Sequence, residues 1–143
     1  MKTLKDVMTR EAEVLEPRAS LRQAAEMMRR LDADSLPVCE EGKLVGLVTD
    51  RDLVVRGVAM GHDVDHSRVS SVMSEDVEGL SPDTPVEEAM RRMEDSSLDG
   101  LLVVDGERHL LGHVSRSVLF PDVPHAPTPR ELEEFFGSGA SWH

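Results

Sequence analysis

The chain of 143 residues has little cysteine, few aromatic residues and no excess of positive charge. Cys39 is its single cysteine, so no intramolecular disulfide can form, and a reducing cytoplasm is the expected setting. Because Cys39 lies in the apolar run "LPVC", we interpret it as a small core residue rather than a reactive thiol. The net charge of -12 opposes the positive surface that binding to nucleic acids or anionic membranes requires.

Long apolar runs are missing as well. The opening "MKTLKDVMTR" lacks the apolar core of a signal peptide, and no apolar stretch reaches the length needed to cross a bilayer. We therefore expect a soluble cytoplasmic protein whose partners include neither nucleic acid nor a membrane. The length suits one compact domain, or two packed halves that share a core.

An internal repeat organises the chain. The segment "VMTREAEVLEP" from Val7 matches "VMSEDVEGLSP" from Val72, at an offset of 65 residues. The match continues from "DSLPVCEEGKLVGLVTDRDL" to "DGLLVVDGERHLLGHVSRSVL", where one extra residue makes the offset 66 from Gly46 and Gly112 onward. Self-similarity at a fixed period indicates that one structural unit occurs twice.

Both copies begin with the same local signals. A short strand is predicted before the proline of each copy, near residues 14–15 and 77–80. Capping boxes follow at 20–23 and 84–87, and the second has Pro85 at the first helical position. Apolar residues then recur at spacings of three and four, which predicts one buried face on each helix. They are Leu21, Ala24, Ala25 and Met28 in the first copy, and Val86, Ala89, Met90 and Met93 in the second.

Two strands around a glycine-containing turn are predicted next, at 35–39 and 44–49 in the first copy and at 100–104 and 110–115 in the second. A helix follows each pair. In the first copy it is expected to end at Gly61. In the second it is cut short by Pro121, because proline cannot donate an interior helical hydrogen bond.

The resulting order resembles a tandem pair of CBS domains. The residues that carry the resemblance are "DVM" and "SVM" at the two openings, "SLPV" on a middle strand, and "GLVTDRD", which fits the family's glycine-apolar-apolar-(Ser/Thr)-x-x-Asp phrase. The segment "TDRDLVVRGVAMGHD" resembles the small stand-alone pairs, including the hypoxic-response type. The resemblance implies an α/β (α+β) fold in which two βαββα repeats pack sheet to sheet with pseudo-twofold symmetry, and implies a homodimer. The expected divisions are repeat 1 at 1–66, repeat 2 at 67–121, and a proline-rich linker with a short C-terminal helix at 122–143.

The resemblance also implies a ligand site. In the family, clefts between the repeats bind adenosyl ligands, with the Asp of the phrase on the ribose hydroxyls and the Ser/Thr near the phosphates. A carboxylate has two acceptor oxygens, so Asp52 suits a ribose diol, while Thr49 at a helix start suits phosphate and Arg51 adds positive charge. Candidate ligands are AMP, ADP, ATP and S-adenosylmethionine, and no cofactor is required. The middle strands offer a flat surface for adenine at Pro37, Val38, Leu102 and Val103.

Two observations keep other readings open. Thr49 and Asp52 also fit a capping box, in which both side chains satisfy backbone groups of their own helix. In the second copy Ser115 replaces Thr49, but Val118 stands where Asp52 stood, so that copy lacks the carboxylate for a ribose. Arg116 remains as a candidate for a phosphate. We therefore expect at most one adenosyl site.

Other candidate features are weaker. The segment "GHDVDH" at 61–66 has histidine and aspartate at loose metal-ligand spacing, but a polar linker explains it. Without a nucleophile-base pair or a glycine-rich phosphate loop, we expect no enzyme. The tail places Leu132, Phe135 and Phe136 on one side of a short helix that is expected to dock on its own module or on a second subunit. Two functions follow as hypotheses: a non-enzymatic adenosyl sensor that acts on an effector protein outside this chain, or a ligand-free assembly protein.

Overall fold

The computed structural model describes residues 2–94 and 100–121. The elements of the first half are α1 (Leu4–Val7), α2 (Leu21–Leu31), β1 (Ser35–Glu40), β2 (Lys43–Thr49) and the π-helix η1 (Asp52–Val58). Those of the second half are the short helix η2 (Val69–Ser71), β3 (Gly79–Leu80), α3 (Val86–Glu94), β4 (Gly100–Val104), β5 (Leu110–Ser115) and α4 (Arg116–Leu119). The tail helix expected within 122–143 lies outside the described residues.

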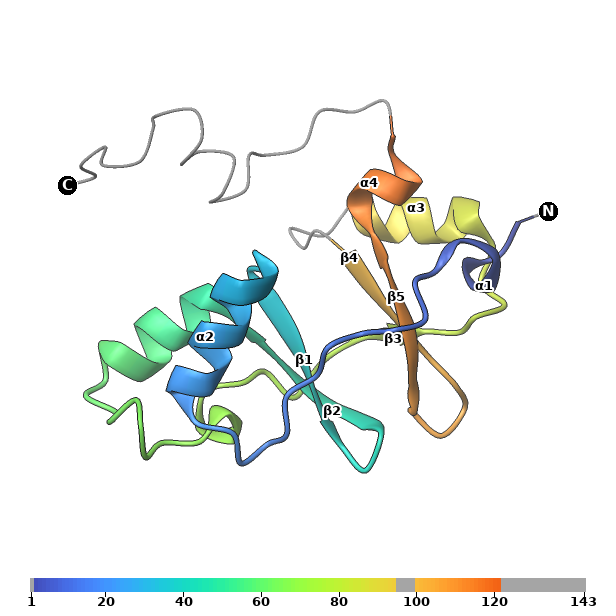
Figure 1. Cartoon of the computed structure of the whole chain (residues 1–143). Coiled ribbons are helices and arrows are strands. Elements are labelled where there is room, and N and C mark those ends of the chain that lie inside the picture. The colour runs from blue at the N-terminus through green and yellow to red at the C-terminus, as the bar shows by residue number, and fades with distance from the viewer. Residues whose placement is uncertain (1, 95–99, 122–143) are drawn as a thin grey trace.

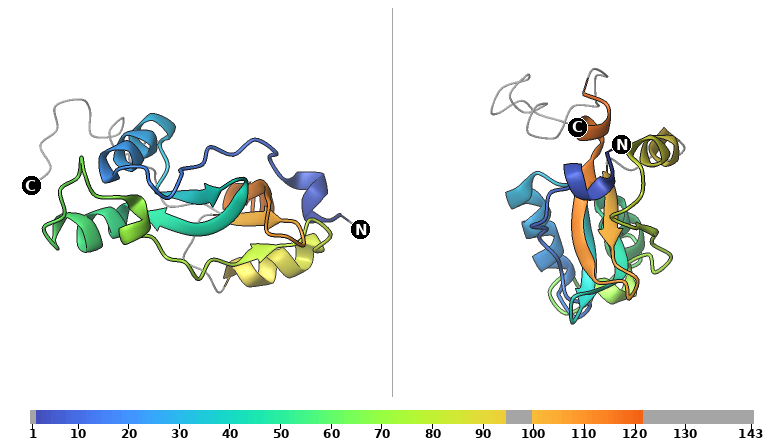
Figure 2. Two further views of the ribbon diagram at one scale, coloured as in Figure 1. Left: turned by 90° about the horizontal axis from the view of Figure 1, so that it is seen from below. Right: turned by 90° about the vertical axis from the view of Figure 1, so that its right-hand side faces the viewer.

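Two small sheets form the centre of the molecule, and the helices lie toward its two ends (Figures 1 and 2). Strands β1 and β2 pair antiparallel, and β4 pairs antiparallel with β5 and parallel with β3. The opening strand predicted for the first copy is reduced to a bridge at Leu15, whose N–H donates to the Pro37 carbonyl at 3.0 Å. The α+β class is confirmed.

The capping box at the start of α2 is confirmed. The Ser20 N–H donates to Gln23 Oε1 at 2.8 Å, and the Gln23 N–H donates to Ser20 Oγ at 3.1 Å. The helix buries Leu21, Ala24 and Met28, as its spacing predicts, but Ala25 is exposed. Position 25 falls at the edge of the apolar face, so only the three central positions reach the core.

The helices that follow the second hairpin strand differ between the copies. In the first copy, η1 has the wider turn of a π-helix, in which the Ala59 N–H donates to the Val54 carbonyl at 2.8 Å. The chain then turns at Gly61, which has a left-handed φ of +82° that glycine adopts without strain. In the second copy, α4 has only four residues before Pro121, as the proline predicts.

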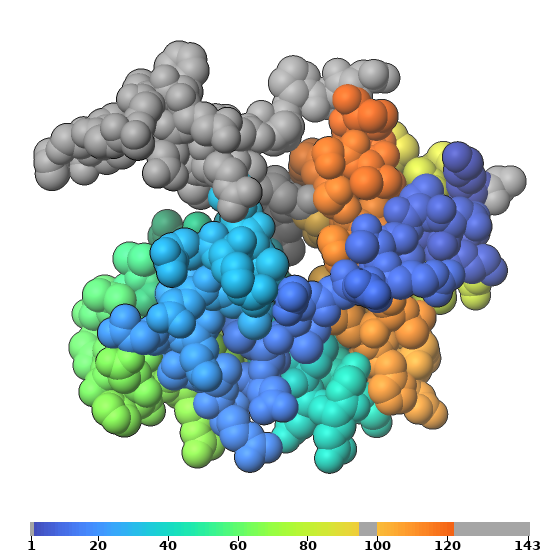
Figure 3. Space-filling view, viewed as in Figure 1, coloured from blue at the N-terminus to red at the C-terminus, as the bar shows by residue number. Residues whose placement is uncertain are grey.

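The two repeats exchange their opening segments. Leu4 of α1 is fully buried in the core of the second repeat, and its N–H donates to the Thr84 carbonyl at 3.0 Å. Val69, which lies 65 residues later, is fully buried in the core of the first repeat, and its N–H donates to the Ala19 carbonyl at 2.8 Å. Figure 3 shows the blue N-terminal segment spread over the orange surface of the second repeat.

The glycines of the repeated phrase make room for this exchange. A Cβ atom at Gly46 would collide with Met73 of the opening segment that lies over β2, and one at Gly112 would collide with the Thr9 carbonyl of the other segment. The hairpins also meet directly, because the Leu44 N–H donates to the Arg108 carbonyl at 2.9 Å. The repeats are therefore joined both by exchanged segments and by their hairpins.

Candidate functional site

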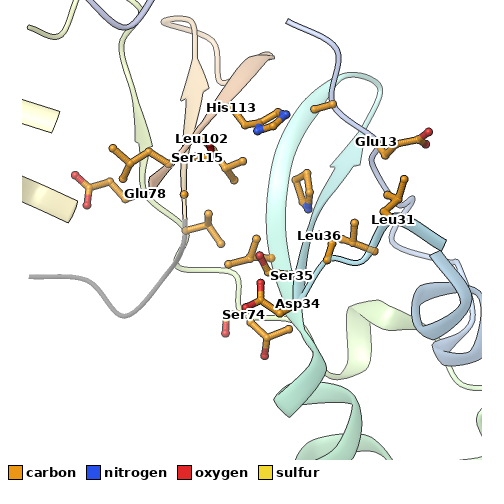
Figure 4. A pocket seen from close by; sticks show the side chains of 18 of the residues that line it. Glu13, Leu31, Asp34, Ser35, Leu36, Ser74, Glu78, Leu102, His113 and Ser115 are labelled. Carbon is orange, nitrogen blue, oxygen red and sulfur yellow. The ribbon is translucent and has the colours of Figure 1, made fainter. Parts of the chain in front are cut away.

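A cleft of about 760 Å³ lies between the two sheets. Leu36 of β1 and Leu102 of β4 lie on its facing walls, His113 lies toward one end, and Asp34 and Ser74 lie toward the other (Figure 4). Small-molecule sites in proteins enclose roughly 300–1,000 Å³. The cleft therefore has room for a nucleoside or nucleotide.

Residues of the lining are related by the sequence repeat, so the cleft straddles the pseudo-twofold axis. At the offset of 65 or 66 residues, eight lining residues of the first repeat correspond to eight lining residues of the second. The related pairs are Glu11 and Asp76, Ala12 and Val77, Glu13 and Glu78, Ser35 and Gly100, Leu36 and Leu101, Pro37 and Leu102, Leu47 and His113, and Thr49 and Ser115. The two middle strands thus face one shared cleft, a point that the sequence left open.

Five of the nine candidate ligand-binding residues line this cleft. They are Pro37, Thr49, Asp52, Leu102 and Ser115. Val38 and Val103 are fully buried in the two cores, because neighbouring residues of a strand point to opposite faces of the sheet. The lining does not include Arg51 or Arg116.

Thr49 and Asp52 form a reciprocal capping box at the end of β2. The Thr49 N–H donates to Asp52 Oδ2 at 2.9 Å, and the Asp52 N–H donates to Thr49 Oγ1 at 3.0 Å. The Asp52 side chain is 15% exposed, and its Oδ1 lies 3.8 Å from Arg56 Nη1. The box therefore fixes the carboxylate at the wall of the cleft while Oδ1 stays clear of the backbone of its own turn.

The other backbone donors of this turn also have partners. The Asp50 N–H donates to the Asp34 carbonyl at 2.9 Å, and the Arg51 N–H donates to Asp50 Oδ1 at 2.7 Å. With the capping box, every N–H from Thr49 to Asp52 is engaged within the protein. A phosphate at this turn would have to displace those bonds.

The corresponding turn of the second repeat is built differently. Ser115 Oγ lies 3.1 Å from Ser117 Oγ, and Val118, which replaces the aspartate, is 46% exposed. The Arg116 guanidinium donates to the Met93 carbonyl at 2.9 Å and lies 5.6 Å from the ring centre of Phe120. These contacts hold Arg116 against its own repeat.

Acidic side chains outnumber basic ones in the described lining, a feature that the sequence did not predict. Six acids are present, Glu11, Glu13, Asp34, Asp52, Asp76 and Glu78, against one arginine, Arg92. Arg92 pairs with Glu78 and lies 3.8 Å from Glu88. The sequence repeat could have indicated this excess of acids, because four of them come from matching positions of the two copies.

The histidine-aspartate segment between the repeats makes a contact within itself and a contact to α2. His66 Nδ1 lies 3.0 Å from Asp63 Oδ2, and this contact raises the pKa of His66. Asp65 pairs with Arg22, which lowers the pKa of the Asp65 carboxyl. Within residues 2–94 and 100–121, no three histidine, cysteine, aspartate or glutamate side chains are placed to hold a metal ion.

Cys39 is buried between the two hairpins, where it packs with Leu44 and Val104. Burial raises the pKa of its thiol, which keeps the thiol in its protonated form. Its contacts agree with a core role. Separately, no helix in the described part of the chain has the length and apolar character required to span a bilayer.

The CBS domain model matches the chain twice, at residues 4–57 and 69–120. The chain is 33% identical to the CBS domain-containing protein YhcV of Bacillus subtilis over 115 residues, which cover 80% of this chain and 81% of YhcV. It is 26% identical to Hypoxic response protein 1 of Mycobacterium tuberculosis over 125 residues, 87% of each protein. Homoserine O-acetyltransferase of Methanohalobium evestigatum is 31% identical over 111 residues, which span 77% of this chain but only 22% of the enzyme.

Solved structures share the fold. The crystal structure of Hypoxic Response Protein I with two coordinated zinc ions has a TM-score of 0.75 at 26% identity, covering 86% of this chain and all of that one. CBSX2 in complex with AMP has a TM-score of 0.74 at 24% identity, over 85% and 95% of the two chains. The CBS domain pair of MJ0100 in complex with 5′-methylthioadenosine and S-adenosyl-L-methionine has a TM-score of 0.70 at 24% identity, over 84% and 98%.

Proposed function

Because the chain belongs to the CBS domain family, we propose that it is a non-enzymatic regulatory module that senses an adenosyl ligand in the cleft between its two repeats. The observation that carries this proposal is the carboxylate of Asp52, which the capping box holds at the wall of a cleft of about 760 Å³. The protein structures of the same fold in complex with AMP, or with 5′-methylthioadenosine and S-adenosylmethionine, support it.

The parts of an adenosyl ligand fit different parts of the cleft. Adenine packs between the apolar walls at Leu36 and Leu102, where its flat face replaces water. Asp52 accepts hydrogen bonds from the two vicinal ribose hydroxyls, because a carboxylate has about four lone-pair sites and the capping box uses one of them. The capping role and the ligand role are therefore compatible.

Signalling follows from the position of the cleft. Both repeats contribute to its lining, so a bound ligand stabilises one arrangement of the repeats relative to others. Ligand occupancy then changes the affinity for an effector protein only if the two arrangements bind that effector differently. We place this effector outside the chain and the module in the cytoplasm.

The homodimer expected for the family would use the outer face of η1. Val54, Val55, Val58 and the nearby Met60 are between 45% and 73% exposed, and they follow one another on or just after this helix. A contiguous apolar patch on a soluble protein is typical of an interaction site. We propose that a second copy of the chain covers it.

A second candidate function is assembly without a ligand. The observation that favours it is Val118, which removes the carboxylate from the second repeat, together with the engagement of Asp52 by its own turn. Under this alternative the exposed apolar residues of η1 are the functional surface, and the cleft holds only water.

Titration calorimetry with adenosine, AMP, ADP, ATP and S-adenosylmethionine, together with thermal unfolding of each mixture, separates the two functions. At a ligand concentration 100 times the dissociation constant, binding should stabilise the folded state by about 2.7 kcal/mol. A sensor shows heat and a raised melting temperature with at least one of these ligands. An absence of both with all five would favour assembly alone.

A further inference from the structure

Resting on the proposed function, we infer that the cleft selects adenosyl ligands by the charge at their 5′ end, and that it takes a cationic 5′ group in preference to a phosphate. The inference concerns selectivity within the cleft already described. Three features of that cleft carry it: the excess of carboxylates, the positions of the arginines, and the backbone donors of the turn at Thr49.

Carboxylates from both repeats line the cleft, although Glu13 also lies 3.9 Å from Arg30. Glu11 and Glu13 come from the segment before α2, and their counterparts Asp76 and Glu78 come from the segment before β3. Their arrangement by the pseudo-twofold axis places negative charge on both sides of the cleft. Clefts lined by one sign of charge focus the potential, which concentrates ions of the opposite sign.

The arginines near the two turns lie outside the lining or already have partners, and Arg56 lies 3.8 Å from the Asp52 carboxylate. Arg116 donates to the Met93 carbonyl on its own repeat, and Arg51 is exposed and outside the lining. Arg92 reaches the lining but pairs with Glu78 and approaches Glu88. A phosphate would therefore have to break an existing ion pair to gain Arg92, the one arginine of the described lining.

The backbone offers a phosphate little in compensation. The N–H groups from Thr49 to Asp52 already donate within the protein, at distances of 2.7 to 3.0 Å. The donors that usually hold a phosphate at such a turn are thus engaged in this conformation. The Asp52 carboxylate remains suited to ribose, which is common to phosphorylated and unphosphorylated ligands.

The expected size of the selectivity follows from Coulomb's law. In water, one unit charge about 8 Å from a carboxylate changes affinity by about twofold, before salt screening. Several carboxylates act together on a ligand charge that changes by three units between an amine and a phosphate dianion. We therefore expect at least about a tenfold preference for the cation at low ionic strength, and a smaller preference as salt is added.

Three ligands that differ only at the 5′ position test the inference. They are 5′-amino-5′-deoxyadenosine, adenosine and AMP, titrated into the full chain by calorimetry near neutral pH at low and high salt. The expected order of affinity is amine, then adenosine, then AMP. S-adenosylmethionine and S-adenosylhomocysteine provide a second matched pair, since they differ by one methyl group and the sulfonium charge, and the sulfonium should bind more tightly.

A matched pair of variants assigns the effect to the lining. The double variant Glu11→Gln/Asp76→Asn removes two lining carboxylates, and the control Glu16→Gln/Glu26→Gln removes two exposed carboxylates outside the lining. The cleft variant should reduce the amine-to-AMP affinity ratio by about threefold or more at low salt, and the control should reduce it less. Both variants should unfold at nearly the same temperature as the wild type, because all four side chains are exposed.

The outcomes distinguish this inference from the proposed function. If AMP binds as tightly as the amine, or if both double variants change the ratio equally, the selectivity is contradicted while the sensing function stands. If neither adenosine nor any of its derivatives binds, the sensing function fails and the selectivity fails with it. Binding in the expected order, weakened by salt and by the cleft variant, supports both.

Discussion

The two repeats share their folding plan but differ at the cleft. Equivalent positions such as Val38 and Val103, or Leu53 and Leu119, are buried in both copies. At the turn after the second hairpin strand, however, the first copy has the fixed carboxylate of Asp52 and the second has Val118. Packing therefore requires the same residue types in both copies, whereas the proposed ribose contact requires an acid in only one.

The largest expected effect on stability comes from substitutions in the exchanged opening segments, which contribute Leu4 and Val69 to the cores of the two repeats. Leu4→Ala should lower the free energy of unfolding by about 2–5 kcal/mol, because it leaves a cavity in the core of the second repeat. Val69→Ala, at the matching position, should destabilise the core of the first repeat, and by less because fewer side-chain carbon atoms are lost. Chemical denaturation measures both effects.

Hydrogen exchange locates the damage in each variant. Leu4→Ala should increase the exchange of amides in β4 and β5 before those in β1 and β2, and Val69→Ala should do the reverse. Greater exchange first in the repeat that contains the substituted residue in sequence would contradict the exchanged arrangement.

Removal of the carboxylate from the first copy should weaken binding more than any change at the matching position of the second. Loss of charge-assisted hydrogen bonds costs about 1.5–3 kcal/mol, so Asp52→Asn should reduce affinity for adenosine by about tenfold or more. The asparagine oxygen can still accept from the Thr49 N–H, so the fold should be retained. Calorimetry with Val118→Ala as the control should show almost unchanged affinity, and equal losses in both variants would contradict the assigned asymmetry.

The helices after the two hairpins differ in exposed apolar surface, which predicts different effects on assembly. Val58→Asp on η1 should weaken dimerisation by on the order of tenfold, because an unpaired carboxylate would enter the apolar interface. Val14→Asp, at another exposed valine, should have little effect. Sedimentation velocity over a range of concentrations measures the change, and a wild type that is already monomeric would contradict the proposed interface.

Restoring an acid to the second copy should sharpen the comparison. Val118→Asp adds a carboxylate at the position that corresponds to Asp52, next to Ser115. The added carboxylate offers further acceptors to ribose hydroxyls, so we expect the affinity for adenosine to increase, by about threefold at most. The gain is limited because α4 is short and does not hold the acid as firmly as η1 does. Calorimetry checks the gain, and Val118→Asn is the uncharged control.

Much of this fold could be predicted from the sequence, because the responsible signals are local or repeated. The Ser20 capping box, the buried stripe at Leu21, Ala24 and Met28, and the early end of α4 at Pro121 each depend on a few neighbouring residues. The exchange of Leu4 and Val69 could not be predicted in this way. Each residue packs in the core of the other repeat, among residues distant from it in the sequence.

The candidate site was less accessible to sequence reasoning for a related reason. The phrase "TDRD" drew attention to Thr49 and Asp52, which do line the cleft, but also to Arg51, which does not. Which charged residues line a cleft between two repeats depends on how the repeats pack together. The sequence alone therefore did not place Glu13 and Glu78 in the lining.

The smallest expected effect is a lowered pKa of Asp105 in the hairpin turn of the second repeat. The pKa of Asp105 is lowered, first by the His109 backbone N–H, which donates to the Asp105 carboxylate at 2.9 Å. The Glu107 backbone N–H and the His109 ring also contact this carboxylate and lower its pKa. Because the ionised form is stabilised in the folded state, this stabilisation is present above the unfolded-state pKa and is lost as pH falls through the folded-state pKa. NMR titration of the carboxyl carbon should give a midpoint below the value of about 3.9 for an unfolded aspartate, and an equal or higher midpoint would contradict these contacts.

Intermolecular nuclear Overhauser effects test the shared cleft most directly. Adenosine, added to protein labelled with ¹³C at leucine and threonine methyl groups, should show contacts from its adenine protons to both Leu36 and Leu102, and from its ribose protons to Thr49. Such contacts would place one ligand between the two repeats with its sugar at Asp52. Contacts to one repeat alone, or to methyl groups outside the cleft, would contradict the account.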